Sequence, residues 1–194
     1  MRARHKTMTG VLLWAVVAAV SLQGQGAETF TATASVKTAG GAAATAPVTI
    51  VVSRKMPKDE ADKLVASFKT GGVTALRSAL GGVKPTGSIK LGKGAATPTR
   101  LTIERTTDKG RLLTIVTDKP ILFLGSGLPG AKPKQGYDFA VADLEVDASG
   151  KGTGTLAPAA KITVKGDAFV VEDYGAEQVE LKDVAKKGAA KPAK

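Results

Sequence analysis

The 194-residue chain contains no cysteine and no asparagine, and its only histidine and only tryptophan, His5 and Trp14, lie near the N-terminus. If that segment is removed by processing, no imidazole or thiol remains. These absences exclude Ser-His-Asp and Cys-His catalysis, zinc sites built from His or Cys, thiol redox chemistry and asparagine-linked glycosylation. Without disulfides, packing alone must stabilise the fold.

Residues 1–26 have the layout of a secretory signal peptide, with three basic residues in the first six positions, an apolar stretch at 11–20, and small and polar residues at 21–27. Cleavage after Gly26 is expected, and cleavage after Ala27 is the alternative. An uncleaved anchor is the other interpretation, but the apolar stretch is shorter than the ~20 residues of a spanning helix. We therefore expect a periplasmic or extracellular protein whose mature chain has no transmembrane segment.

Residues 27–184 are long enough for a single domain with its own core. The last ten residues, 185–194, contain four lysines and no acid, and provide half of the +8 formal charge left after cleavage. We interpret them as a disordered basic tail, with attraction to an anionic envelope component as the alternative. Nucleic acid is not an expected partner, because the chain has only five Phe and two Tyr for stacking and no basic stripe. The sequence does not define an oligomeric state.

The domain is expected to open with two strands, at 28–36 and 47–53, on either side of a low-complexity loop at 39–46. A helix is predicted at about 57–69, since Pro57 suits a first helical position and an apolar stripe follows. Gly71-Gly72 is expected to end it, and a second helix is predicted at about 73–80.

Everything downstream is predicted to be strands and turns. The predicted strands are 88–91, 100–105, 111–116, 121–124, 139–146, 161–164, 168–171 and 179–182. A hairpin turn at 107–110 would place Leu101, Ile103, Leu113 and Ile115 on one buried face. This order predicts an α+β fold, a largely antiparallel sheet with a two-helix insertion after the second strand, and a β-sandwich with a helical insertion is the alternative.

Two glycine motifs match nucleotide sites only by letter. Residues 125–130, GSGLPG, follow an apolar stretch as a dinucleotide fingerprint does, but Pro129 and Pro133 oppose the helix that the site requires. Residues 87–93, GSIKLGK, fit the start of a P-loop, but Gly94 replaces the Ser or Thr that binds magnesium. No cofactor is expected.

Carboxylates supply the remaining candidates for catalysis. Asp143, Glu145 and Asp147 alternate along a predicted strand and share one face, opposite Ala142, Leu144 and Val146. Cation binding is one interpretation of this face, and solvent exposure is the simpler one. A carboxylate-dependent hydrolase would draw on Glu145, Asp143, Asp138 and Glu172.

The long loop 125–136 leads into Tyr137, and loops of this length are often functional. Lys132, Lys134 and Tyr137 are the candidate residues for binding an anionic or sugar ligand, and a proline-stiffened surface loop without a ligand is the alternative interpretation. The leading hypothesis is an exported, cofactor-free module that binds or scaffolds an unknown ligand and does not catalyse. The hydrolase and an envelope-associated protein are the alternatives.

Overall fold

The computed structural model describes residues 26–37, 43–121, 136–166, 168–173 and 178–188, which contain nine strands and one helix. In chain order the elements are β1 (Glu28–Lys37), β2 (Ala43–Val52), α1 (Lys58–Gly82), β3 (Gly87–Leu91), β4 (Thr97–Thr107), β5 (Gly110–Thr117), β6 (Phe139–Val146), β7 (Lys151–Lys165), β8 (Ala168–Asp173) and β9 (Val179–Lys186). The predicted strand at 139–146 is confirmed at both ends. β2 begins at Ala43, inside the predicted loop 39–46.

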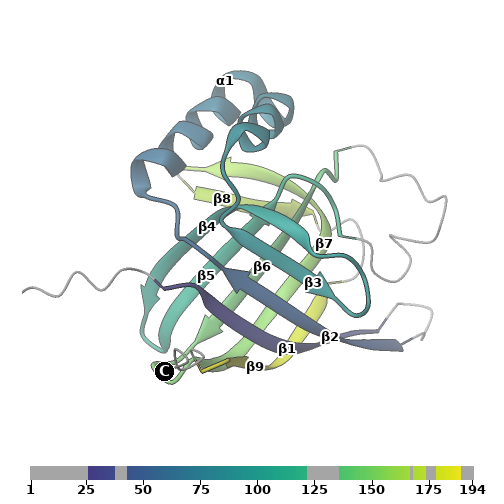
Figure 1. The fold of residues 1–194 in the computed structure, drawn as a ribbon. Coiled ribbons are helices and arrows are strands. Elements are labelled where there is room, and N and C mark those ends of the chain that lie inside the picture. The colour runs from purple at the N-terminus through teal and green to yellow at the C-terminus, as the bar shows by residue number, and fades with distance from the viewer. Residues whose placement is uncertain (1–25, 38–42, 122–135, 167, 174–177, 189–194) are drawn as a thin grey trace, which may run out of the picture.

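Eight of the strands close into an antiparallel barrel (Figure 1). The strands from β1 to β7 pair in sequence, and β9 lies between β7 and β1 and completes the circle. The predicted α+β fold with a two-helix insertion is therefore wrong, and so is the β-sandwich alternative. Local patterns identified the strands, but closure depends on β9 meeting β1 from the opposite end of the domain, and no local pattern encodes that contact.

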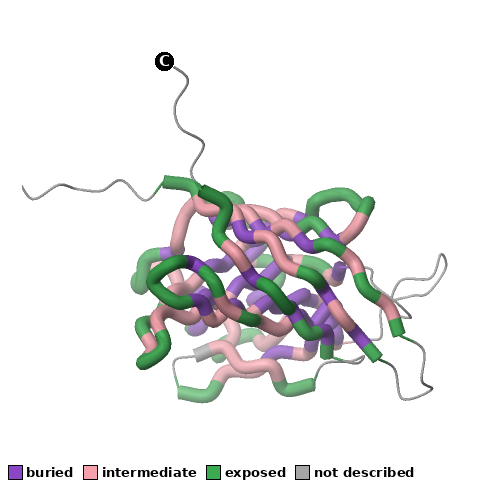
Figure 2. Tube along the Cα trace, turned by 90° about the horizontal axis from the view of Figure 1, so that it is seen from below, coloured by how far each residue is buried: buried purple, intermediate pink, exposed green. Residues whose placement is uncertain are grey.

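The side chains that point into the barrel form its main core, in which buried residues collect as Figure 2 shows. β6 illustrates the alternation: Ala142 and Leu144 are fully buried, whereas Asp143 and Glu145 are partly exposed. The two-sided pattern predicted for this strand is thus confirmed. Among the largest side chains of the core are Phe30, Ile50, Ile89, Leu113, Leu144 and Leu156.

β4 contributes hydroxyl groups to the interior in place of apolar side chains. Thr99 and Thr102 are fully buried, and Thr102 lies opposite the core residue Ile115. The Thr102 hydroxyl donates to Oγ1 of Thr86 at 2.9 Å, and the Thr86 and Thr99 hydroxyls are 3.0 Å apart. Three buried hydroxyls thus satisfy one another, as buried polar groups must.

A second apolar layer covers part of the outside of the barrel. β8 pairs only with residues 161–165 of β7, and this hairpin, called the arm below, packs with α1 against the outer face of β4, β5 and β6. Phe68 of α1 contacts Phe169 of the arm edge-to-face, with ring centroids 6.4 Å apart. Figure 1 shows α1 lying above β8.

This second layer corrects the predicted hairpin face. Leu101 lies opposite Val116 in the outer layer, whereas Leu113 and Ile115 line the interior. The four residues Leu101, Ile103, Leu113 and Ile115 therefore do not share a face. Both faces of β4 and β5 are covered, so apolar residues point to both sides of these strands. The alternation of apolar and polar residues therefore cannot show which side faces the interior.

α1 consists of two helical segments that meet at a kink, and the kink lies at the glycines predicted to separate two helices. Gly71 and Gly72 leave the helical region, and Gly72 has φ of 64°, which glycine adopts without strain. The second segment follows these glycines, as predicted, and continues to Gly82. Its residues Leu64, Leu76 and Leu80 are buried in the outer layer.

Candidate functional site

The predicted ligand residues do not form a site in the described structure. Lys132 and Lys134 lie outside the described residues, as does the motif at 125–130. Tyr137 is buried, and its hydroxyl donates a hydrogen bond to the carboxylate of Asp173. This contact ties the start of β6 to the end of the arm. The other glycine motif, 87–93, is strand β3 followed by a turn, which is not the loop that a P-loop needs.

The four hydrolase candidates take four different partners. Asp138 pairs with Arg77 at 3.0 Å and Asp143 accepts from the Thr114 hydroxyl at 2.7 Å. Glu145 lies 3.8 Å from Lys109, and Glu172 lies 3.3 Å from Lys161. No two of these carboxylates share a partner in the described part of the chain. Among the described residues there is also no group of three or more potential ligands placed to hold a metal ion.

Asp147 has a structural role at the turn between β6 and β7. Its carboxylate accepts hydrogen bonds from the Ser149 hydroxyl and from the main-chain N–H groups of Ser149 and Lys151. The hydrogen bond from the Ser149 side chain, followed by those from the main chain, lowers the pKa of Asp147. This arrangement is a side-chain-stabilised turn.

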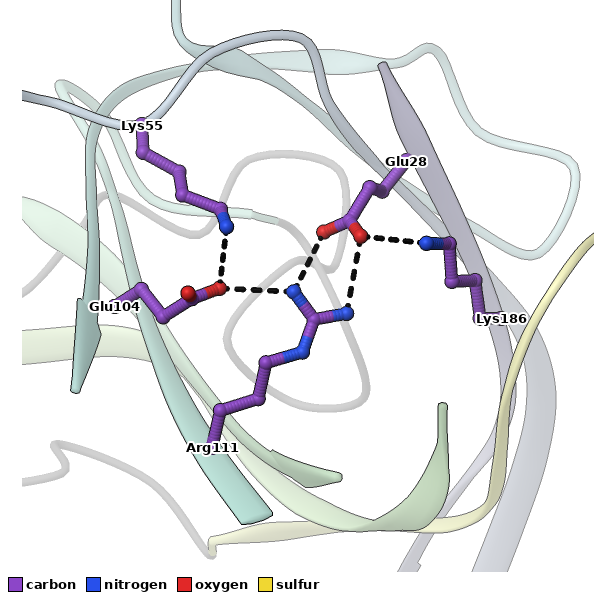
Figure 3. A network of polar contacts seen from close by, with 5 residues as sticks. All are labelled: Glu28, Lys55, Glu104, Arg111 and Lys186. Carbon is purple, nitrogen blue, oxygen red and sulfur yellow. Dashed lines mark hydrogen bonds and ion pairs between the residues drawn. The ribbon is translucent and has the colours of Figure 1, made fainter. Parts of the chain in front are cut away.

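One end of the barrel is closed by a cluster of five charged side chains, called the mouth network below (Figure 3). Arg111 is at its centre: its guanidinium donates to both oxygens of Glu28, at 2.9 and 3.0 Å, and to Glu104 at 2.8 Å. Lys55 lies 2.6 Å from Glu104, and Lys186 lies 2.6 Å from Glu28. The network thus joins β1, β4, β5, β9 and the segment after β2.

The network residues that lie on strands are on the same face of those strands as the apolar side chains of the barrel interior. Glu28 is two residues before the core residue Phe30, and Arg111 is two residues before Leu113. The Arg111 guanidinium carbon lies 5.8 Å from the centroid of the Phe30 ring. None of these residues was selected from the sequence. The sequence signal that could have identified them is a charged residue at a strand end, two positions from a buried apolar residue of the same strand.

Both carboxylates of the network are held in the charged form. Burial alone would raise the pKa of Glu28, but hydrogen bonds and charge from Arg111 and Lys186 outweigh it and lower the pKa below 4.5. Burial would likewise raise the pKa of Glu104, but the hydrogen bonds and charges of Lys55 and Arg111 outweigh this effect and lower the pKa. The hydrogen bond to Glu28 raises the pKa of Arg111 more than burial lowers it. Two ionised carboxylates bound by cations hold no proton to donate as a general acid. Their ion pairs connect the strands at this end of the barrel.

We expect the free energy of unfolding to fall as the solution is acidified below pH 4.5. Because the folded-state pKa values of Glu28 and Glu104 are lowered, the unfolded chain binds their protons first. Their contribution to stability is complete above the ordinary pKa value and is lost as pH falls through the lowered values. Urea unfolding between about pH 6 and about pH 3 measures it. The double variant Glu28→Gln/Glu104→Gln should show a shallower dependence, and an identical dependence in both proteins would contradict the assignment.

A groove lies between the arm and the outer wall of the barrel, with a volume of about 270 Å³. It is called the outer groove below. Its floor comes from outward residues of β5 and β6: Leu112, Thr114, Val116, Val141 and Asp143. Its roof comes from the arm: Ile162, Phe169, Val170 and Val171. Arg105 of β4 completes the lining.

Two charged groups in the outer groove have no ion-pair partner among the described residues. Arg105 is exposed and pairs with no carboxylate of the described residues, and the one hydrogen-bond partner of the Asp143 carboxylate there is the Thr114 hydroxyl. An apolar recess with a few oriented polar groups is the usual form of a small-ligand site. Asp143 was selected from the sequence as an acid, but its place in a groove follows from the arm, which folds over β5 and β6 from a distant part of the chain.

Comparisons with protein-family models, with curated proteins and with solved structures found no match to this chain. Within the ranges that the structure describes, no helix has the length and apolar character needed to cross a bilayer.

Proposed function

We propose that this protein is an exported, non-catalytic binding module whose ligand site is the outer groove. The observation that carries the proposal is the groove itself, with apolar walls from both β5–β6 and the arm and with Asp143 and Arg105 as its charged groups. Its volume of about 270 Å³ accommodates one small molecule and not a polymer chain. The dispersed carboxylates described above favour binding over hydrolysis.

Export is supported by the N-terminal layout and by the position of β1. β1 begins at Glu28, so cleavage after Gly26 or Ala27 would leave every described strand intact. N-terminal sequencing of exported material should begin at Ala27 or Glu28. Recovery of the full-length chain from the cytoplasm alone would refute this part of the proposal.

We expect a small neutral apolar probe, 1-octanol, to bind in the outer groove of the mature protein. In an NMR titration, saturable shifts should be confined to groove residues such as Val116, Val141 and Phe169. Val170→Trp, which fills the groove from its roof, should weaken binding at least about tenfold.

Val51→Trp is the matched control, because Val51 is also half-buried but lies on β2, outside the groove. It should bind the probe as the unmodified protein does. Shifts that do not saturate, or that spread evenly over the barrel, would overturn the proposed site. So would unchanged binding by Val170→Trp.

A further inference from the structure

We propose that the outer groove selects a small amphiphile with a primary ammonium head, and that the carboxylate of Asp143 binds this head. The inference rests on the proposed function of the groove and names the chemistry of its ligand. It depends on how Asp143 differs from the other carboxylates of the molecule.

Among the described residues, every half-buried carboxylate other than Asp143 is paired with a cation. Seven lie in the described residues: Glu28, Glu60, Glu104, Asp118, Asp138, Asp143 and Glu145. Six of them have a lysine or arginine nitrogen between 2.6 and 3.8 Å away. Asp143 is the exception within these ranges, since its one partner is the neutral hydroxyl of Thr114 at 2.7 Å. A carboxylate partly removed from water costs free energy unless a cation compensates it, and the open groove lets a ligand supply that cation.

The neighbours of Asp143 define where the two ends of such a ligand would lie. Thr114 of β5 lies opposite Asp143 of β6. The next outward-facing pair along these strands, Val116 and Val141, is apolar and belongs to the outer layer. The roof above is apolar, with Phe169 and Val171. An alkyl chain over Val116 and Val141 therefore places its head group beside the Asp143 carboxylate.

Arg105 does not favour the opposite assignment, a ligand with an anionic head. It lies opposite Leu112, two residues from the position that faces Asp143, and it is exposed. An exposed guanidinium is well hydrated and gains little from a partner, whereas a half-buried carboxylate gains more. The volume of about 270 Å³ equals that of about nine liquid waters, which is close to a chain of roughly eight carbons with one head group.

The test compares three probes of equal chain length, octylamine, 1-octanol and octanoate, by NMR titration of the mature protein at neutral pH. We expect octylamine to bind about tenfold more tightly than 1-octanol, the increment typical of one charge-assisted hydrogen bond in a partly exposed site. Asp143→Asn should remove this preference and leave 1-octanol binding unchanged. Thr114→Val, which removes the hydroxyl that orients Asp143, should reduce the preference.

Glu145→Gln is the matched control, because Glu145 is the next outward carboxylate on β6 but already has Lys109 and does not line the groove. It should keep the preference for octylamine. Equal binding of octylamine and 1-octanol would overturn the inference and leave the proposed function standing. Tighter binding of octanoate, lost in Arg105→Gln, would replace it with an anionic ligand. Failure of all three probes to bind would refute the proposed function itself.

Discussion

Replacement of Arg111 by methionine is expected to lower the free energy of unfolding by about 3 kcal/mol. The guanidinium bridges Glu28 of β1 and Glu104 of β4, so it neutralises two carboxylates at one end of the barrel. Methionine preserves much of the side-chain volume but leaves Glu104 with Lys55 and Glu28 with Lys186 alone. The Arg111 side chain is 22% exposed, so the loss should lie below that of a fully buried ion pair.

The control for Arg111→Met is Arg105→Met, an arginine of the preceding strand without an ion-pair partner among the described residues. Urea unfolding should show a change of at most about 0.5 kcal/mol for Arg105→Met. A loss for Arg111→Met no larger than that for Arg105→Met would show that the mouth network does not stabilise the barrel.

The sequence predicted elements well and their assembly poorly. Alternation located β6 to the residue, and the β-branched stretch located most of β2, because these signals are local. The closure of the barrel was not predictable in this way. β7 pairs along residues 151–160 with β6 and β9 and then continues into the arm at 161–165. Of this 15-residue strand, only residues 161–164 were predicted as a strand.

The candidate site shows the same limit at the level of side chains. Residue type alone made Asp143, Asp138, Glu145 and Glu172 equivalent, but the structure distinguishes them by their partners. Glu28 and Arg111 were overlooked because a charged residue in a strand is ordinarily assigned to the solvent face. Here they lie at a barrel end, where a charged inward group can reach water and a counter-ion together.

The two adjacent leucines of β5 provide the sharpest test of the closed barrel. Leu113 is fully buried in the interior, whereas Leu112 is half-buried and lines the outer groove. We expect Leu113→Ala to lower the free energy of unfolding by about 4 kcal/mol, since it removes interior contacts and leaves a cavity that a closed barrel cannot collapse. Leu112→Ala should cost about 1 kcal/mol, because its site is already open to solvent.

The same two variants should have the opposite order of effects on the groove. Leu112→Ala removes part of the floor and should weaken 1-octanol binding, whereas Leu113→Ala should leave binding unchanged at temperatures where the protein is folded. Urea unfolding and NMR titration of both variants measure the two effects independently. Equal losses of stability would mean that β5 does not separate an interior from an outer layer, and the barrel and the groove would both be incorrect. Because the residues are neighbours with identical side chains, only the direction in which each points can produce the crossed result.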